Sequence, residues 1–222
     1  MNPSAKTTTF SWNYGRAEII ADGIIHAIGI ALGVAGAAVL LLIAFHTARD
    51  GEIAWVIIYV VGLLSMLSVS AAYNIWPVSP HKWMLRRFDH SAIYLLIAST
   101  YTPFLLHMKN GTLSATMLVT VWLTASVGMA LKLFWPGRLD RLSIGLYLVL
   151  GWSGVLVYGP VAAALRPMTL WLIAIGGVLY SIGVLFHVWE RLRFHTAIWH
   201  CFVLSAACCH YTAVLTCVTL TI

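Results

Sequence analysis

The stretch IADGIIHAIGIALGVAGAAVLLLIAF, residues 20–45, is apolar throughout except for Asp22 and His26. A run of about 20 predominantly apolar residues is long enough to cross a bilayer as a helix. Six further runs of this kind follow, at 53–76, 90–108, 113–134, 143–164, 168–188 and 197–220. Because lipid offers the backbone no hydrogen-bond partners, only helices and closed barrels span it. The sequence therefore predicts an all-α polytopic membrane protein, a bundle of seven transmembrane helices.

The composition agrees with this fold class. Of the 222 residues, 61% are hydrophobic and only 9% are charged, whereas about a quarter of the residues in a soluble domain are charged. Too few polar residues remain to cover a water-soluble core. We expect residues 1–17, which are largely polar, to form a short cytoplasmic N-terminal segment. Residues 18–222 are then a single seven-helix transmembrane domain.

The basic residues are distributed unevenly between the two ends of the predicted helices. Ten of them lie at the end where the first, third, fifth and seventh runs begin, and only Arg49, Lys109 and Arg166 lie at the other. Loops rich in Lys and Arg face the cytoplasm, which predicts a cytoplasmic amino terminus and an outside carboxyl terminus. Attraction to anionic lipid head groups accounts for the net charge of +6. We therefore expect membrane lipids as partners, and neither nucleic acid nor a soluble protein.

Polar side chains gather at the predicted cytoplasmic ends of four runs. They are Glu18, Asp22 and His26 in the first run, Ser70 and Asn74 in the second, Asp89 at the start of the third and His200 in the seventh. Residues four apart share a helix face, and a rise of about 1.5 Å per residue puts the whole set at a similar depth. Ionisable groups at membrane depth are costly and often functional. We predict that this set lines one cavity open to the cytoplasmic leaflet. The alternative is that single members only serve helix ends, as Asp89 would by capping the third helix.

Two further histidines, His195 and His210, lie in or just before the seventh run but outside this set. His210 falls at mid-bilayer in the seventh run, where a neutral histidine needs a partner, and we expect it to face the bundle interior. In RFHTAIWHCF, residues 193–202, His195 and His200 are five residues apart. Ligands on one helix face need a spacing of three or four, and a spacing of five separates them by roughly 140°. The position that would complete an H-x3-H with His200 is Thr196.

Six segments together resemble the hemolysin III proteins, the bacterial branch of the progestin and adiponectin receptor superfamily. They are AEIIADGIIHAIGI, SAAYNIWP, FDHSAIYLLIASTYTPFLL, GWSGVLVY, GGVLYSIGVLFHV and HTAIWHCFVLSAACCH, and they cover the chain from about residue 16 to 215. The resemblance implies a seven-helix fold in the bacterial inner (cytoplasmic) membrane with a cytoplasmic amino terminus. It also implies an association with membrane homeostasis.

The resemblance further implies a zinc site in the cytoplasmic leaflet. In the family, zinc is held by a histidine four residues after a serine in the second helix and by both histidines of an H-x3-H in the seventh. An aspartate at the start of the third helix orders the water. Here Ser70 and Asp89 match, but Asn74 and Thr196 replace two of the three histidines and only His200 remains.

These replacements predict weak or absent zinc binding, because amide and hydroxyl groups are poor zinc ligands and three imidazoles form the usual site. Two routes to a rebuilt site stay open. Asp22, Asp89 or His26 supplies replacement ligands, or His195 turns inward. Asp22 stands at the middle place of the family's first motif, which usually reads Glu, Asn and His.

Three functions follow as hypotheses. The favoured one is a membrane protein without enzymatic activity that senses lipids or maintains lipid homeostasis. The first alternative is a zinc-dependent lipid amide or ester hydrolase, with Asp89 as general base and Ser70 and His200 placing water or substrate. The second alternative is a pore-forming hemolysin, which the scarcity of charges in the outer halves of the runs disfavours.

Overall fold

Helices make up the regular structure of the described part of the chain. A computed structural model describes residues 14–47, 51–135 and 140–219, so residues 1–13 of the predicted N-terminal segment and the carboxyl-terminal Ile222 lie outside it. The helices are α1 (Arg16–Thr47), α2 (Glu52–Ile75), α3 (Pro80–Leu106), α4 (Gly111–Phe134), α5 (Asp140–Trp152), the 3₁₀ helix η1 (Ser153–Val157), α6 (Tyr158–Ala164), α7 (Pro167–Val188) and α8 (His195–Thr219). The predicted all-α class is confirmed.

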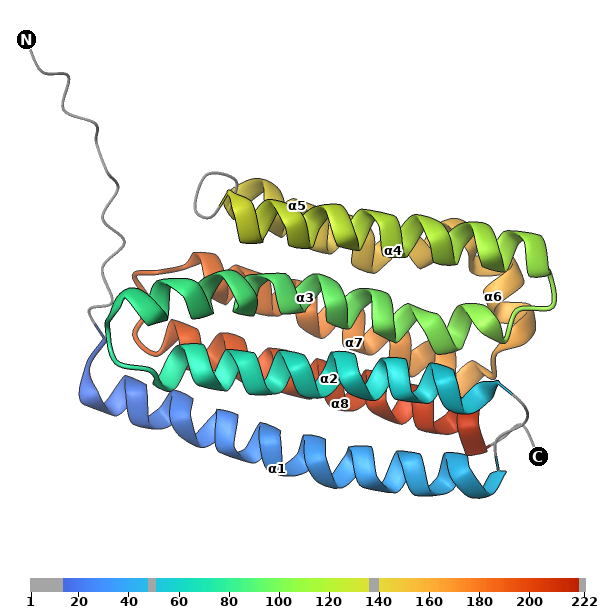
Figure 1. Ribbon diagram of the computed structural model, residues 1–222, viewed down its shortest axis with the longest axis horizontal. Helices are drawn as coiled ribbons and strands as arrows, with labels where there is room; N and C mark the ends of the chain where they lie inside the picture. The colour runs from blue at the N-terminus through green and yellow to red at the C-terminus, as the bar shows by residue number, and fades with distance from the viewer. Residues whose placement is uncertain (1–13, 48–50, 136–139, 220–222) are drawn as a thin grey trace, which may run out of the picture.

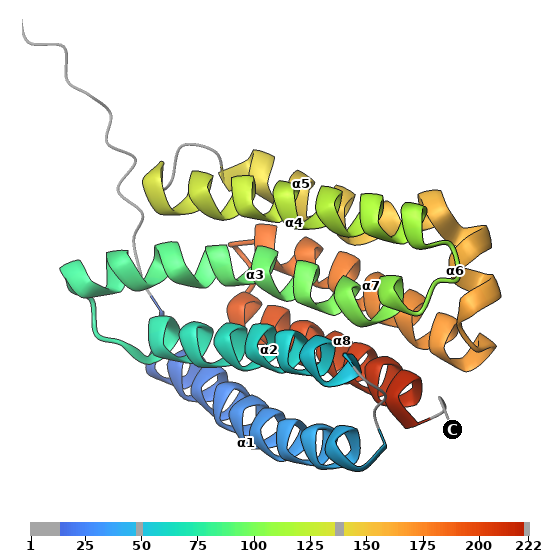
Figure 2. The same cartoon turned by 45° about the vertical axis from the view of Figure 1, so that its right-hand side comes forward.

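The long helices run side by side along one axis (Figure 1). α4 and α5 lie along one side of the bundle, α1 lies along the opposite side, and α2, α3, α7 and α8 lie between them, as the turned view also shows (Figure 2). α1 begins and α8 ends at opposite ends of the bundle. This arrangement places the start of α1, the end of α2, the start of α3 and the start of α8 at one shared end.

Six helical segments of the described residues are long and apolar enough to cross a membrane. They are α1, α2, α4, the stretch Leu142–Ala164, α7 and α8. α3 has 27 residues but is not among them, so these criteria support six spans where the sequence predicted seven. The chain is a membrane protein with several apolar spanning helices.

α3 differs most from its predicted extent of 90–108. It begins at Pro80, where Ser79 accepts a hydrogen bond from the Lys82 backbone N–H and proline occupies the first turn, a favourable start for a helix. The Lys82 ammonium also donates to the carbonyls of Asn74 and Trp76 at 3.2 and 2.8 Å, at the carboxyl end of α2. Asp89 therefore lies well inside α3, and the interpretation of it as a helix cap is wrong.

The fifth predicted span is broken near its middle. α5 gives way to the 3₁₀ helix η1 and then to α6, and the Tyr101 side chain of α3 engages the backbone at the break. Its hydroxyl donates to the Gly151 carbonyl at 2.7 Å and accepts from the Gly154 N–H at 2.8 Å. Backbone groups released by a break must find such partners within a membrane.

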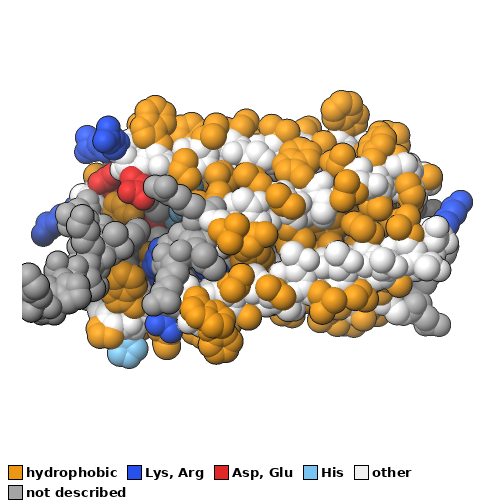
Figure 3. Space-filling view, turned by 90° about the horizontal axis from the view of Figure 1, so that it is seen from above, with side chains coloured by type: hydrophobic (Ala, Val, Ile, Leu, Met, Phe, Trp, Pro, Cys, Tyr) orange, Lys and Arg blue, Asp and Glu red, His pale blue; other side chains and the backbone are white. Residues whose placement is uncertain are grey.

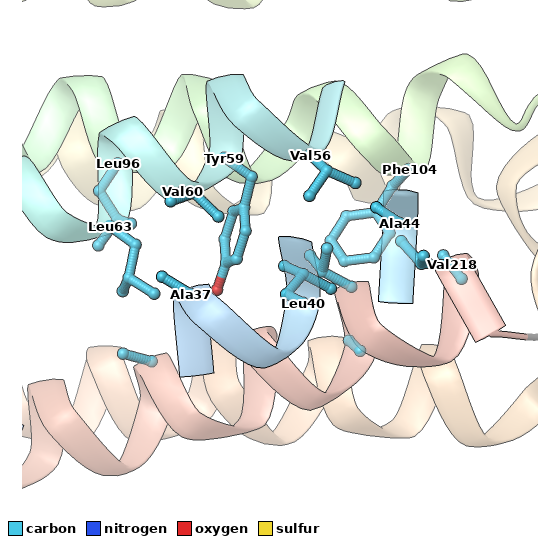
Figure 4. Packing of buried hydrophobic residues seen from close by; sticks show 14 of the residues in the cluster. Ala37, Leu40, Ala44, Val56, Tyr59, Val60, Leu63, Leu96, Phe104 and Val218 are labelled. Atoms are coloured by element: carbon cyan, nitrogen blue, oxygen red, sulfur yellow. The ribbon is translucent and has the colours of Figure 1, made fainter. Parts of the chain in front are cut away.

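The principal apolar core lies between α1, α2, α3 and α8 (Figure 4). Leu40 and Ala44 of α1 pack there with Val56 and Tyr59 of α2, all at most 1% exposed. On the same face of α1, a Cβ placed at Gly29 would contact Leu67 and Leu204 at 3.4 and 3.5 Å. This glycine face therefore serves packing within the bundle.

Candidate metal centre and cavity

Three buried side chains from two helices meet at the shared end of the bundle. The His200 Nδ1 atom of α8 lies 2.6 Å from the Asp22 Oδ1 atom of α1. The other carboxylate oxygen of Asp22 lies 3.5 Å from the His26 Nε2 atom, and the two imidazole centroids are 4.4 Å apart. Asp22, His26 and His200 are between 6% and 8% exposed.

The spacing of residues along α1 turns two of these side chains toward α8. Asp22 and His26 are one turn apart on α1, so both face α8. Glu18, one turn earlier, accepts hydrogen bonds from the Gly15 N–H at 2.8 Å and from the Phe194 N–H at 3.0 Å. This carboxylate ties the chain just before α8 to the first turn of α1.

Ser70 and Asp89 extend this cluster. The Ser70 hydroxyl of α2 is hydrogen-bonded to the Asp89 carboxylate of α3, which also lies within electrostatic range of His200, His26 and Arg86. Asp89 is half-buried. The helices α1, α2, α3 and α8 thus each contribute a polar side chain to one region, although only α1 and α8 supply the three-residue contact.

Asn74 and Thr196 stand where the resemblance implies histidines, and both side chains contact residues outside the three-residue cluster. The Asn74 amide donates to the Ser70 carbonyl at 2.9 Å, within its own helix. The Thr196 hydroxyl lies 3.4 Å from His195 Nε2, and the His195 ring lies 6.0 Å from the Tyr14 ring. Within the described residues, His195 is outside the group that could share a metal.

Asp22, His26 and His200 fit a metal ion. Each offers one ligand atom, and these atoms all lie within 4.8 Å of one another. Among the described residues, the buried His26 Nε2 atom has no hydrogen-bond partner and lies 3.5 Å from the Asp22 carboxylate, so it is available as a metal ligand beside that carboxylate. Two imidazoles and a carboxylate are also a donor set of catalytic zinc sites, which leave a fourth position open.

A large cavity adjoins the cluster and has a volume of about 1130 Å³. Glu18, Asp22, Asn74, Asp89 and His200 line it. So do the outlying residues His195, Thr196 and His210. His26 and Ser70 lie beyond His200, beside a void of only about 20 Å³. The predicted set of residues thus divides between two adjoining spaces.

His210 lies deeper along α8. Its Nε2 atom is 3.2 Å from the Ile173 carbonyl of α7, and its ring lies against Gly176. A larger residue at that glycine would collide with the imidazole. The contacts therefore join α7 to α8 and leave His210 half-buried on the cavity wall.

Sequence reasoning missed three basic residues of this cavity. Lys82, Arg86 and Lys132 line it and are at most 8% exposed. From the sequence, these residues predicted only which end of the helices faces the cytoplasm. The spacing of four between Lys82 and Arg86, which places both on one face of a helix, could have indicated two of them, whereas Lys132 lies on another helix and carries no such signal.

The chain is similar to known proteins over most of its length. The family described as "Haemolysin-III related" matches residues 17–211. The "Hemolysin-3 homolog" of Bacillus subtilis (strain 168) is 38% identical over 198 residues, which cover 89% of this chain and 93% of the relative. The "Hemolysin-3" of Bacillus cereus is 35% identical over 201 residues, 89% of this chain and 90% of the relative. The human "Monocyte to macrophage differentiation factor" is 33% identical over 169 residues, 72% and 68% of the two chains. The chain therefore belongs to the haemolysin-III-related family.

Proposed function

We propose that this protein binds a lipid in its large cavity, holds zinc at Asp22, His26 and His200, and takes part in membrane lipid homeostasis or lipid sensing. One observation carries the proposal. Three buried side chains of metal-ligand type converge within 4.8 Å, and two of them line a cavity of about 1130 Å³. Ligand pockets of about 300–1,000 Å³ are typical of small-molecule sites, so the space suits a long amphiphile.

We also propose that the protein crosses the bacterial cytoplasmic membrane seven times, with α3 as the seventh span and the amino terminus inside. Charged side chains gather at one end of the molecule, and hydrophobic ones cover its length (Figure 3). The described cations at the shared end are Arg16, Lys82, Arg86, Arg87, Lys132, Arg191 and Arg193, against Lys109 and Arg166 at the other. This excess favours a cytoplasmic position for the shared end, with the metal centre and the polar end of the cavity in the inner leaflet.

Hydrolysis of a lipid amide or ester is a second candidate function, and the position of Asp89 favours it. A bound zinc ion supplies Lewis acidity that polarises a carbonyl and makes water more acidic. The Asp89 carboxylate lines the same cavity and is held by Ser70, so it is placed to accept a proton from a water molecule there. Asp22 and His200, whose Oδ1 and Nδ1 atoms are 2.6 Å apart, would hold that ion together with His26.

A matched pair of tryptophan substitutions tests lipid binding in the cavity. Val184 of α7 lines the cavity and is half-buried, whereas the adjacent Leu185 does not line it and is 62% exposed. Val184→Trp fills space that the lipid needs, so we expect about a tenfold loss of affinity, equivalent to about 1.4 kcal/mol. Leu185→Trp should leave affinity unchanged. Native mass spectrometry and lipid extraction of the purified proteins report bound lipid, and equal occupancy in the two variants would overturn the proposal.

A further inference from the structure

Two polar side chains, Tyr180 of α7 and His210 of α8, lie on the cavity wall far from the candidate metal centre. Both line the cavity, and their ring centroids are 5.6 Å apart. His210 follows His200 on α8 by ten residues, which places it about 15 Å farther along the helix. Polar groups at such a depth in a membrane protein are costly without a partner. We call Tyr180 and His210 the deep polar pair.

One nitrogen of the His210 ring is bonded within the protein. Nε2 lies 3.2 Å from the Ile173 carbonyl, and because a carbonyl oxygen only accepts, Nε2 carries the proton. A neutral imidazole in this form has a lone pair on Nδ1. The Cδ2–Nε2 edge of the ring lies against Gly176, so Nδ1 lies on the other side of the ring. Among the described residues, nothing donates a hydrogen bond to it.

The Tyr180 hydroxyl is the second open group. It makes no hydrogen bond to the described part of the chain. A phenol hydroxyl donates one hydrogen bond and also accepts. The deep polar pair therefore presents one acceptor and one group of both kinds to the same part of the cavity.

Other polar side chains on the cavity wall are satisfied within the protein. The Tyr101 hydroxyl donates to the Gly151 carbonyl at 2.7 Å. The Trp152 indole N–H donates to the Ser181 hydroxyl at 3.0 Å, and that hydroxyl donates in turn to a carbonyl of its own helix. Buried polar groups are normally bonded in this way. The open groups of the deep polar pair depart from this pattern and point to a ligand.

A hydroxyl group on a ligand matches both open groups. It donates to the imidazole Nδ1 and accepts from the Tyr180 hydroxyl. A ketone only accepts and leaves Nδ1 without a donor, and an ionised group is costly at this depth. Apolar residues such as Ile97 and Leu148 line the cavity as well, and they suit a hydrocarbon chain on which the hydroxyl is carried. The chemistry therefore favours a neutral alcohol.

We propose that the deep polar pair binds a hydroxyl group carried midway along the hydrocarbon chain of a lipid in the cavity. This inference rests on the proposed lipid-binding function, because it names the class of lipid for the same cavity. An extended chain advances about 1.2 Å per bond, so a hydroxyl about 15 Å from the level of His200 is about 12 bonds from a head group there. A buried water molecule offers the same two hydrogen bonds, and the experiment separates the two.

The test compares lipids that share a neutral head group and a chain length. Purified protein in neutral detergent is titrated with octadecanoylglycerol, 2-hydroxyoctadecanoylglycerol and 12-hydroxyoctadecanoylglycerol, and native mass spectrometry follows binding. The common glycerol head group removes any difference in charge between the probes. We expect the 12-hydroxy lipid to bind about tenfold more tightly than the other two, the scale of one or two neutral hydrogen bonds.

Variants assign this preference to the deep polar pair. Tyr180→Phe keeps the ring and removes the hydroxyl, so the preference should disappear while the affinity for octadecanoylglycerol stays unchanged. His210→Leu removes the acceptor and should act in the same direction. Tyr211→Phe is the matched control, because the Tyr211 hydroxyl donates to the Gly36 carbonyl at 2.9 Å and the residue does not line the cavity. This variant should keep the tenfold preference.

The contrary outcomes are distinct. Equal affinity for the three probes shows that water serves the deep polar pair, which overturns the inference although lipid binding survives. Tighter binding of the 2-hydroxy lipid than of the 12-hydroxy lipid contradicts the position of the site. A preference that survives both Tyr180→Phe and His210→Leu assigns the hydroxyl to other residues and also overturns the inference. If no probe binds, both this inference and the proposed function fail.

Discussion

Asp22 is the residue on which the cluster depends. Its two carboxylate oxygens face the two imidazoles, 2.6 Å from His200 Nδ1 and 3.5 Å from His26 Nε2. An asparagine, which the family motif usually has here, would add no negative charge between them. An aspartate carboxylate attracts a cation and is itself a zinc ligand. In the proposed metal centre, Asp22 therefore takes the place of an imidazole that Asn74 and Thr196 do not supply.

This compensation predicts the outcome of rebuilding the site. Asp22→Asn should release zinc, because it removes the only carboxylate of the three-residue group. Adding Asn74→His and Thr196→His to that variant should restore zinc, because both positions line the cavity with His200 and three imidazoles form a sound site. Zinc titration followed by competition with a chromophoric chelator measures the affinity. A triple variant with no gain over Asp22→Asn alone would show that the helices do not place these positions around one ion.

Part of the site could be predicted from the sequence, because spacing along one helix is a local property. The spacing of four residues put Asp22 and His26 on one face, and depth along the helices put His200 at their level. The sequence could not say which of the seven candidates touch, since contact depends on which helices are neighbours and on side-chain conformation. Asn74 illustrates this limit, because its amide turns back to its own helix.

At the scale of helices, close packing of α2 against α3 depends on glycine. A side chain at Gly62 would collide with the Ser99 side chain, which is fully buried and bonded to the Leu96 carbonyl at 3.0 Å. Gly62→Ala should therefore lower the free energy of unfolding by about 1–3 kcal/mol, the usual cost of overpacking.

Gly23 provides the matched control for this prediction. A Cβ there meets nothing within 4 Å, so Gly23→Ala should be neutral or should stabilise α1 by up to about 1 kcal/mol through helix propensity. Thermal unfolding of both variants in the same detergent measures the difference. Equal melting temperatures would contradict the close α2–α3 contact.

The helix boundaries show which signals the sequence carries. Five apolar runs predicted their helices closely, because length and hydropathy alone determine a spanning helix. The predicted start of α3 was ten residues too late. Its first turns are polar, and a hydropathy pattern indicates only the apolar part of a helix. The break at Ser153–Val157 was missed because it depends on Tyr101, some 50 residues away.

At the scale of the whole molecule, charge and cavity occupy the same end. The proposed orientation rests on the excess of basic residues at the shared end, and the same end holds the candidate metal ligands Asp22 and His200 and the buried basic residues Lys82, Arg86 and Lys132. The sequence predicted a polar region at this depth. It could not predict a space of about 1130 Å³ lined by α3, α5, α7 and α8, because that volume depends on how these helices pack against one another.

The central claim is that Asp22, His26 and His200 form a working metal centre despite the loss of two family ligands, and elemental analysis tests it most directly. The protein is purified in detergent, washed with a mild chelator and assayed for zinc per chain. We predict about one zinc ion per chain in the unmodified protein and in His210→Gln, which changes a cavity histidine outside the cluster. We predict its loss in Asp22→Asn and His200→Ala. A folded, unmodified protein that holds no zinc after reconstitution with the metal would contradict the claim.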